Sequence, residues 1–260
     1  MFYTKARASF SEAHQRPYNQ DCCFWLSCDG LPTCDAKLSI LCVLDGVSNC
    51  NGGEASTMAA QAMRPVLAGL LGSCEQLLQY DDSIRAEKIL RVLRESILEA
   101  DMVLRRRQMP GVLYGTTATV AVVFDEVVYT ANVGDSPAYL LRINNLDGNI
   151  QSAEPLFRCQ NEAGEDIRSK SANVLTQMIG GAGVLESKIY TTSTWLGGED
   201  LLLLGTDGAL AVLPLPELIE LCNSHLHRGL QRTLDELYQQ IQQSASTDNA
   251  TVLAEWLESR

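Results

Sequence analysis

Residues 116–143 read TTATVAVVFDEVVYTANVGDSPAYLLRI, and three strand-like runs follow one another closely within this stretch. The runs cover residues 116–124, 126–134 and 137–143 and are rich in Val, Thr and Tyr, which favour β-strands. A parallel connection needs a crossover of about a dozen residues or more. Because far fewer residues separate these runs, the stretch predicts antiparallel hairpins.

The sequence on either side adds further strands and several helices. A short apolar run at 38–44, LSILCVL, predicts a buried strand. Apolar residues then recur at spacings of three and four, which predicts amphipathic helices over 52–71 and 83–107. The later pattern predicts strands at 188–194 and 200–205, helices around 215–224 and 229–244, and a closing strand at 250–256.

Residues 144–172 interrupt this pattern with a polar segment that contains NNLDGN and NEAGEDIRSKSAN. Such a composition predicts a turn followed by an exposed, flap-like insertion. The sequence contains no internal repeat or linker. The order of strands and helices therefore predicts a single α+β domain over residues 1–260, with layered antiparallel sheets and helices outside.

The charge balance excludes several classes of function. The 260 residues include 20 Lys and Arg against 32 Asp and Glu, a formal net charge of −12. Binding to nucleic-acid phosphates or to an anionic membrane needs a basic face, so neither is expected. The dense basic run Arg105-Arg106-Arg107 closes a predicted helix, where solvated cations complement the helix dipole.

The sequence shows no targeting segment and no cysteine motif, which predicts an intracellular protein. No apolar run approaches the ~18–20 residues that span a bilayer, and the N-terminal segment lacks the apolar centre of a signal peptide. This predicts a soluble, cytoplasmic protein. The nine cysteines form no C-x-x-C pair, which predicts neither a disulfide framework nor a zinc site. We expect most of them to be small buried hydrophobes.

Four aspartates share one context, at or just beside the end of an apolar run: Asp45, Asp135, Asp207 and Asp248. A single Asp next to Gly is more typical of a turn. Four such carboxylates that converge would instead form an oxygen-only site, which suits Mg²⁺ or Mn²⁺. The sequence has no D-x-D-x-D-G-x₅-E run, which argues against a Ca²⁺ loop of the EF-hand kind.

A series of motifs runs in order through nearly the whole chain. They are R-x-x-N-Q-D at 16–21, V-L-D-G-V with G-G-E-A-S at 43–56, Y-G-T-T-A-T at 114–119, A-N-V-G-D-S-x-A-Y-L at 131–140, N-V-L-T-Q-x-I-G at 173–180, L-L-L-L-G-T-D-G at 201–208 and T-D-N-A-T-V at 247–252. In number, order and spacing they resemble the metal-dependent serine/threonine phosphatases of the PPM, or protein phosphatase 2C, type, closest to compact bacterial members. The resemblance implies a four-layer αββα sandwich with two antiparallel sheets between helices.

The resemblance also implies a metal site and its residues. Asp45 would bridge two divalent cations, the backbone carbonyl of Gly46 would join one, and Asp207 and Asp248 would complete the other. Asp135 matches a position that helps Asp207 hold a third, weaker ion. Asp21 would supply the remaining carboxylate, either in direct contact with a metal ion or through a bound water. The cofactors implied are Mn²⁺ or Mg²⁺.

Catalytic roles are implied for Arg16 and Asp45. Arg16 matches the arginine that binds the substrate phosphate, and two cations that share Asp45 would activate a water for attack on phosphorus. The implied function is hydrolysis of phosphoserine and phosphothreonine esters in a protein substrate, opposing a serine/threonine kinase in signalling. Nucleic acid and membrane are not expected partners.

This sequence departs from the family pattern at four places. Gln20 stands where many members carry Glu, residues 47–50 lack the histidine that some members place there, and Pro137 replaces a common Arg. The insertion at 144–172 also lacks the usual Asp-His signature. An alternative function is therefore a phosphatase-like regulatory binding module with little or no turnover. The presence of the full ligand set favours the enzyme.

Overall fold

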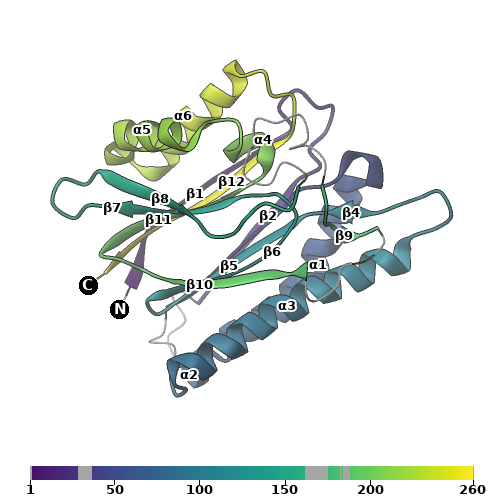
Figure 1. The fold of residues 1–260 in the computed structure, drawn as a ribbon, viewed down its shortest axis with the longest axis horizontal. Coiled ribbons are helices and arrows are strands. Elements are labelled where there is room, and N and C mark those ends of the chain that lie inside the picture. The colour runs from purple at the N-terminus through teal and green to yellow at the C-terminus, as the bar shows by residue number, and fades with distance from the viewer. Residues whose placement is uncertain (1, 29–36, 162–174, 182, 184–187, 260) are drawn as a thin grey trace.

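Two five-stranded antiparallel sheets pack face to face in the computed structural model, and helices cover their outer faces (Figure 1). The structure describes residues 2–28, 37–161, 175–181, 183 and 188–259. The first sheet has the order β1 (Phe2–Glu12), β12 (Ala250–Ser259), β11 (Glu199–Gly205), β7 (Ala138–Ile143), β8 (Ile150–Pro155). The second has the order β10 (Tyr190–Trp195), β6 (Val127–Val133), β5 (Ala118–Phe124), β3 (Leu38–Leu44), β2 (Cys22–Ser27).

Helices form the outer layers. The described α-helices are α1 (Gly52–Gly72), α2 (Cys74–Leu77), α3 (Asp82–Arg107), α4 (Asp207–Leu210), α5 (Leu215–His225) and α6 (Leu230–Gln243). Helices α1 and α3 lie against the second sheet, while α5 and α6 lie against the first (Figure 1). A small two-stranded sheet joins β4 (Gly115–Thr116) to β9 (Ile179–Gly180). The predicted four-layer αββα sandwich is confirmed.

The central strands are apolar on both faces because each lies between a helix layer and the opposite sheet. Along β3, Ile40, Cys42 and Leu44 pack against the helices, while Leu41 and Val43 face the other sheet. Strand β11 divides its leucines in the same way between the helices and the intersheet core. The alternation of side chains along a strand explains why these runs read as continuously hydrophobic.

The predicted hairpin between the second and third strand runs is wrong. Strands β5 and β6 do form an antiparallel hairpin, but β6 and β7 belong to different sheets. Gly134, which has φ +107°, begins the corner between them. A side chain at Gly134 would also meet Thr117, whose Cγ2 would lie 2.6 Å from the added Cβ. The short connection therefore crosses from one sheet to the other and carries Asp135 between them.

Other expectations are confirmed or corrected in detail. The helices at 52–71 and 83–107 and the strands at 188–194, 200–205 and 250–256 are present with small shifts at their ends. Part of the polar segment 144–172 is the edge strand β8, which pairs with β7; residues 162–174 lie outside the described residues. Cys74 is disulfide-bonded, which the sequence did not predict. Among the described residues, no helix is both long and apolar enough to cross a bilayer.

Candidate active site

Five aspartates meet at one edge of the sandwich because strands of both sheets begin or end there. Asp45 directly follows β3, and Asp21 directly precedes its antiparallel neighbour β2, whose Cys22 pairs with Leu44. In the other sheet, β11 ends just before Asp207, and β12 begins just after Asp248. Asp135 comes from the corner that connects the sheets. An antiparallel partner starts where its neighbour ends, so the topology gathers residues far apart in sequence.

Backbone hydrogen bonds fix the position of Asp45. Its amide donates to the hydroxyl of Thr117 at 2.9 Å, and its carbonyl accepts from the hydroxyl of Thr116 at 2.7 Å and the amide of Thr117 at 2.8 Å. The Thr117 hydroxyl also lies 2.7 Å from that of Ser136. The buried hydroxyl pair therefore ties the end of β3 to the corner that carries Asp135.

Gly46 packs directly against the backbone of the first residue of α1. A Cβ on Gly46 would lie 2.4 Å from the carbonyl carbon of Gly52 and 2.5 Å from the carbonyl oxygen of Gln20. No side chain fits at this position. The glycine after Asp45 therefore lets three backbone segments meet beside the cavity.

Burial and mutual repulsion raise the pKa values of the aspartates. Burial is the largest cause of a pKa for Asp45 well above its usual range, and the charges of Asp21 and Asp207 add to it. Burial first, then Asp207, raises the pKa of Asp135 to about 7, and burial likewise raises that of Asp21 to about 7. The Asp45 carboxyl also hydrogen-bonds to the carboxylate of Asp207. In the metal-free protein, burial and mutual repulsion therefore favour the protonated forms of these side chains.

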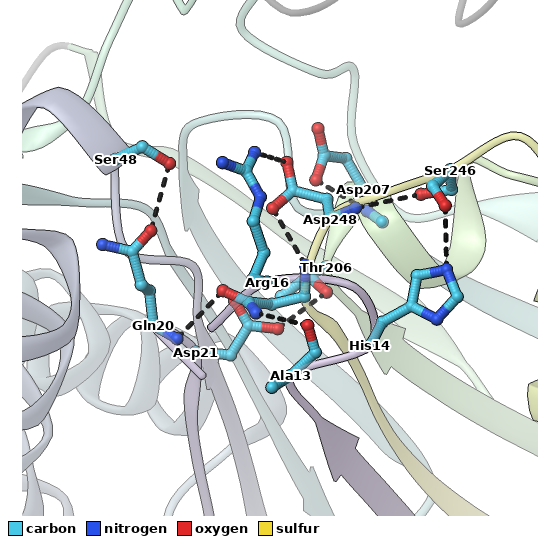
Figure 2. A network of polar contacts seen from close by, with 12 residues as sticks. Ala13, His14, Arg16, Gln20, Asp21, Ser48, Thr206, Asp207, Ser246 and Asp248 are labelled. Carbon is cyan, nitrogen blue, oxygen red and sulfur yellow. Dashed lines mark hydrogen bonds and ion pairs between the residues drawn. The ribbon is translucent and has the colours of Figure 1, made fainter. Parts of the chain in front are cut away.

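Arg16 is the cation that faces this group. It lies on the loop before Asp21 and points toward Asp248, as Figure 2 shows, with its Nη2 3.1 Å from Asp248 Oδ2. The amide of Asn249 donates to the other Asp248 oxygen at 2.9 Å. The Nε of Arg16 is buried and has no hydrogen-bond partner among the described residues. One donor of the guanidinium is therefore unsatisfied.

Two cavities of about 350 and 240 Å³ meet at this edge, and both are lined by Arg16, Asp135, Asp207 and Asp248. Asp45 and Gly46 line the smaller one, together with Ser48 and Leu175. The larger one continues past Pro137 and Cys159 along the start of α4. Asp21 lines neither cavity, and its Oδ2 accepts a hydrogen bond from Thr206 at 3.1 Å (Figure 2).

The donor chemistry of the site fits hard divalent cations. Every acidic side chain in it offers carboxylate oxygens, the ligands that Mg²⁺ and Mn²⁺ prefer. The Oδ1 atom of Asp21 is buried without a hydrogen-bond partner among the described residues, and the pKa values of four aspartates are raised. Within the described parts of the chain, however, no three His, Cys, Asp or Glu side chains are arranged as a complete ligand set.

The residues singled out in the sequence thus lie together, and several supporting residues were missed. Thr117, Ser136 and Thr206 position aspartates through hydrogen bonds. Their only sequence signal was their place inside the Y-G-T-T, G-D-S and G-T-D motifs. His14 does not face the aspartates, because its Nε2 lies 2.8 Å from the Ser246 carbonyl oxygen (Figure 2).

Fold and site together define an αββα sandwich with an acidic cleft between its sheets. Residues 39–148 match the family model described as Protein phosphatase 2C. The Listeria innocua "Serine/threonine phosphatase stp" is 27% identical over 224 residues, 84% of each chain. Its Listeria monocytogenes counterpart is 28% identical over 177 residues, 65% of this chain and 69% of that one. Stp1 of Staphylococcus aureus, a solved serine/threonine phosphatase structure, aligns with a TM-score of 0.77 and 20% identity over 99% of this chain and 96% of its own.

These similarities confirm the resemblance drawn from the motifs. Over residues 39–148 the chain is similar to the protein phosphatase 2C family, and over most of its length it is similar to bacterial serine/threonine phosphatases.

Proposed function

We propose that this protein is a metal-dependent phosphatase that hydrolyses phosphoserine and phosphothreonine esters in protein substrates. The observation that carries the proposal is the convergence of Asp45, Asp135, Asp207 and Asp248 on cavities that also contain Arg16. Four acidic side chains and one arginine make a poor phosphate site unaided, because ionised carboxylates repel an anion and protonated carboxyls supply no positive charge. Cations held by the carboxylates would supply that positive charge.

The residues fall into two roles. We infer that Asp45, the Gly46 carbonyl, Asp207 and Asp248 hold two core ions, with Asp21 behind them, and that Asp135 and Asp207 hold a third, weaker ion. Mn²⁺ or Mg²⁺ suits this donor set. The chemistry that such ions supply is activation of a water for in-line attack on phosphorus.

Arg16 would bind the phosphate. Its guanidinium lies at the boundary of both cavities, has an unpartnered buried Nε, and is held close to the aspartates by the 3.1 Å contact with Asp248. A planar guanidinium can donate to two phosphate oxygens at once, which a lysine ammonium cannot copy. The same contact would orient the ester for attack from the opposite side.

We further propose one catalytic domain over residues 1–260, because β1 and β12, at opposite ends of the chain, pair along their length in the first sheet. A protein with this activity would oppose a serine/threonine kinase in cytoplasmic signalling, since it removes the ester that such a kinase forms.

Phosphate release from a phosphothreonine peptide tests the proposal. We expect turnover with added Mn²⁺ or Mg²⁺ and none in excess EDTA. Turnover that persists in EDTA would contradict the metal requirement. A folded protein that binds Mn²⁺ and the peptide without turnover would support the regulatory binding module instead.

A further inference from the structure

Asn249 is a buried residue, 3% exposed, that connects the start of β12 to the loop of residues 13–20. Its Oδ1 accepts a hydrogen bond from the amide of Gln20 at 2.9 Å. Its Nδ2 donates to the carbonyl oxygens of Ala13 at 3.0 Å and Tyr18 at 3.1 Å. Both donors of the amide are used. One side chain therefore holds the loop at its beginning and at its end.

The loop that Asn249 holds carries Arg16 near its middle and leads directly into Asp21. Arg16 in turn contacts Asp248, the residue before Asn249. The loop and the start of β12 thus meet twice, once through the Asn249 amide and once through the Arg16 guanidinium. The Asn249 contacts are to backbone atoms, so they fix where the loop lies and not only where one side chain points.

We propose that Asn249 is a positioning residue that places Arg16 for phosphate binding; the inference rests on the proposed function. Arg16 has a long side chain, and phosphate binding must hold it in one conformation. With the backbone of the loop already fixed, less conformational freedom is lost when the phosphate binds. Without Asn249, Arg16 would keep its charge but bind phosphate from a looser loop.

A purely structural role for Asn249 makes a different prediction. Loss of three buried hydrogen bonds would lower the free energy of unfolding in either case. Asn223 on α5 provides a matched control, because its Oδ1 accepts from the amide of Ile150 at 2.6 Å and its Nδ2 donates to the carbonyl of the same residue at 3.3 Å. Asn223 lines neither cavity at the acidic edge.

Steady-state kinetics on one phosphothreonine peptide at saturating Mn²⁺ separate the two roles. We expect Asn249→Ala to raise KM about threefold to tenfold and to change kcat less. This range is the cost of ordering one long side chain, here that of Arg16, when the phosphate binds. Asn223→Ala should keep both constants at their wild-type values. In an Arg16→Ala background, Asn249→Ala should raise KM less than twofold, because the group it positions is gone.

Wild-type KM in Asn249→Ala, or an equal KM increase with and without Arg16, would overturn the proposal. Titration calorimetry with Mn²⁺ alone shows whether metal affinity changes, so that kinetics can be compared at full saturation in each variant. If Asn249→Ala does not fold, Asn249→Ser leaves a smaller cavity and takes its place in the same comparison.

Hydrogen exchange gives a readout that does not depend on turnover. The Gln20 amide donates to Asn249, so its exchange should become faster in Asn249→Ala and stay unchanged in Asn223→Ala. Unchanged exchange at Gln20 would contradict the positioning role. A wild-type protein without turnover would contradict the proposed function alone, and exchange would still decide whether Asn249 holds the loop.

Discussion

Replacement of Arg16 should weaken substrate binding without weakening metal binding. In our assignment Arg16 binds the phosphate and does not coordinate a metal ion. We predict that Arg16→Ala lowers kcat/KM chiefly by raising KM, since a phosphate contact exists in both the ground state and the transition state. A charge-assisted hydrogen bond contributes about 1.5–3 kcal/mol. At about 1.36 kcal/mol for each factor of ten, the loss is roughly ten- to a hundredfold.

The stability of the fold should change little in this variant. The Arg16 side chain is 36% exposed and that of its partner Asp248 is 43% exposed. An ion pair with this exposure contributes about 1 kcal/mol or less to the free energy of unfolding. Arg16→Lys keeps the charge but loses the planar, two-point contact, so its KM should lie between those of the wild type and Arg16→Ala.

The assay is phosphate release from one phosphothreonine peptide at saturating Mn²⁺, with Mn²⁺ affinity measured separately by calorimetry. We expect equal Mn²⁺ affinity in all three proteins. Wild-type KM in both variants would remove Arg16 from the phosphate site. A large loss of Mn²⁺ affinity would show that Arg16 acts through Asp248 and not on the phosphate.

The remaining predictions concern the aspartates. Asp45→Asn should abolish turnover in the same assay while circular dichroism shows an intact fold, and retained turnover would contradict its role as the shared ligand. The pKa values of Asp21 and Asp135 are raised from 3.8 to about 7 in the metal-free protein. Protonation of these two side chains therefore adds to the free energy of unfolding, fully below pH 3.8, and this contribution is lost as the pH rises through about 7. The metal-free Tm should therefore fall between about pH 4 and 7, and Mn²⁺ should raise it at pH 7.5; a Tm indifferent to Mn²⁺ would count against the site. Asp135→Ala should weaken one ion selectively in calorimetry, and loss of both stronger ions would show that the division of roles is wrong.

Much of the fold could be predicted because its central strands and long helices carry strong local patterns. Strand β3 is apolar throughout, and α1 and α3 repeat apolar residues at helical spacing. The missed strands have weaker patterns. Strand β8 is a polar edge strand, with Gln151 and Ser152 exposed, and β1 owes its conformation to its long pairing with β12. Edge pairing is a tertiary effect that a short window of sequence does not reveal.

The division of strands between the sheets was also beyond local reasoning. Whether residues 134–137 form a hairpin turn or a corner between the two sheets depends on tertiary packing. Gly134 lies against Thr117, and the hydroxyl of Ser136 hydrogen-bonds to that of the same threonine. The aspartates could be singled out because each ends or precedes a strand. The residues that position the aspartates and Arg16 could not be singled out in this way. Asn249 and Thr206 act through hydrogen bonds to residues more than 180 positions away along the chain.

A crystal structure with Mn²⁺, with anomalous scattering collected at the manganese edge, tests the central claim most directly. We predict two strong anomalous peaks at the acidic edge, with Asp45 contacting both ions and Asp207 and Asp248 contacting one of them. Arg16 should then be free of Asp248. Absence of anomalous peaks at this edge in a crystal grown at millimolar Mn²⁺, or a single ion that does not contact Asp45, would contradict the account.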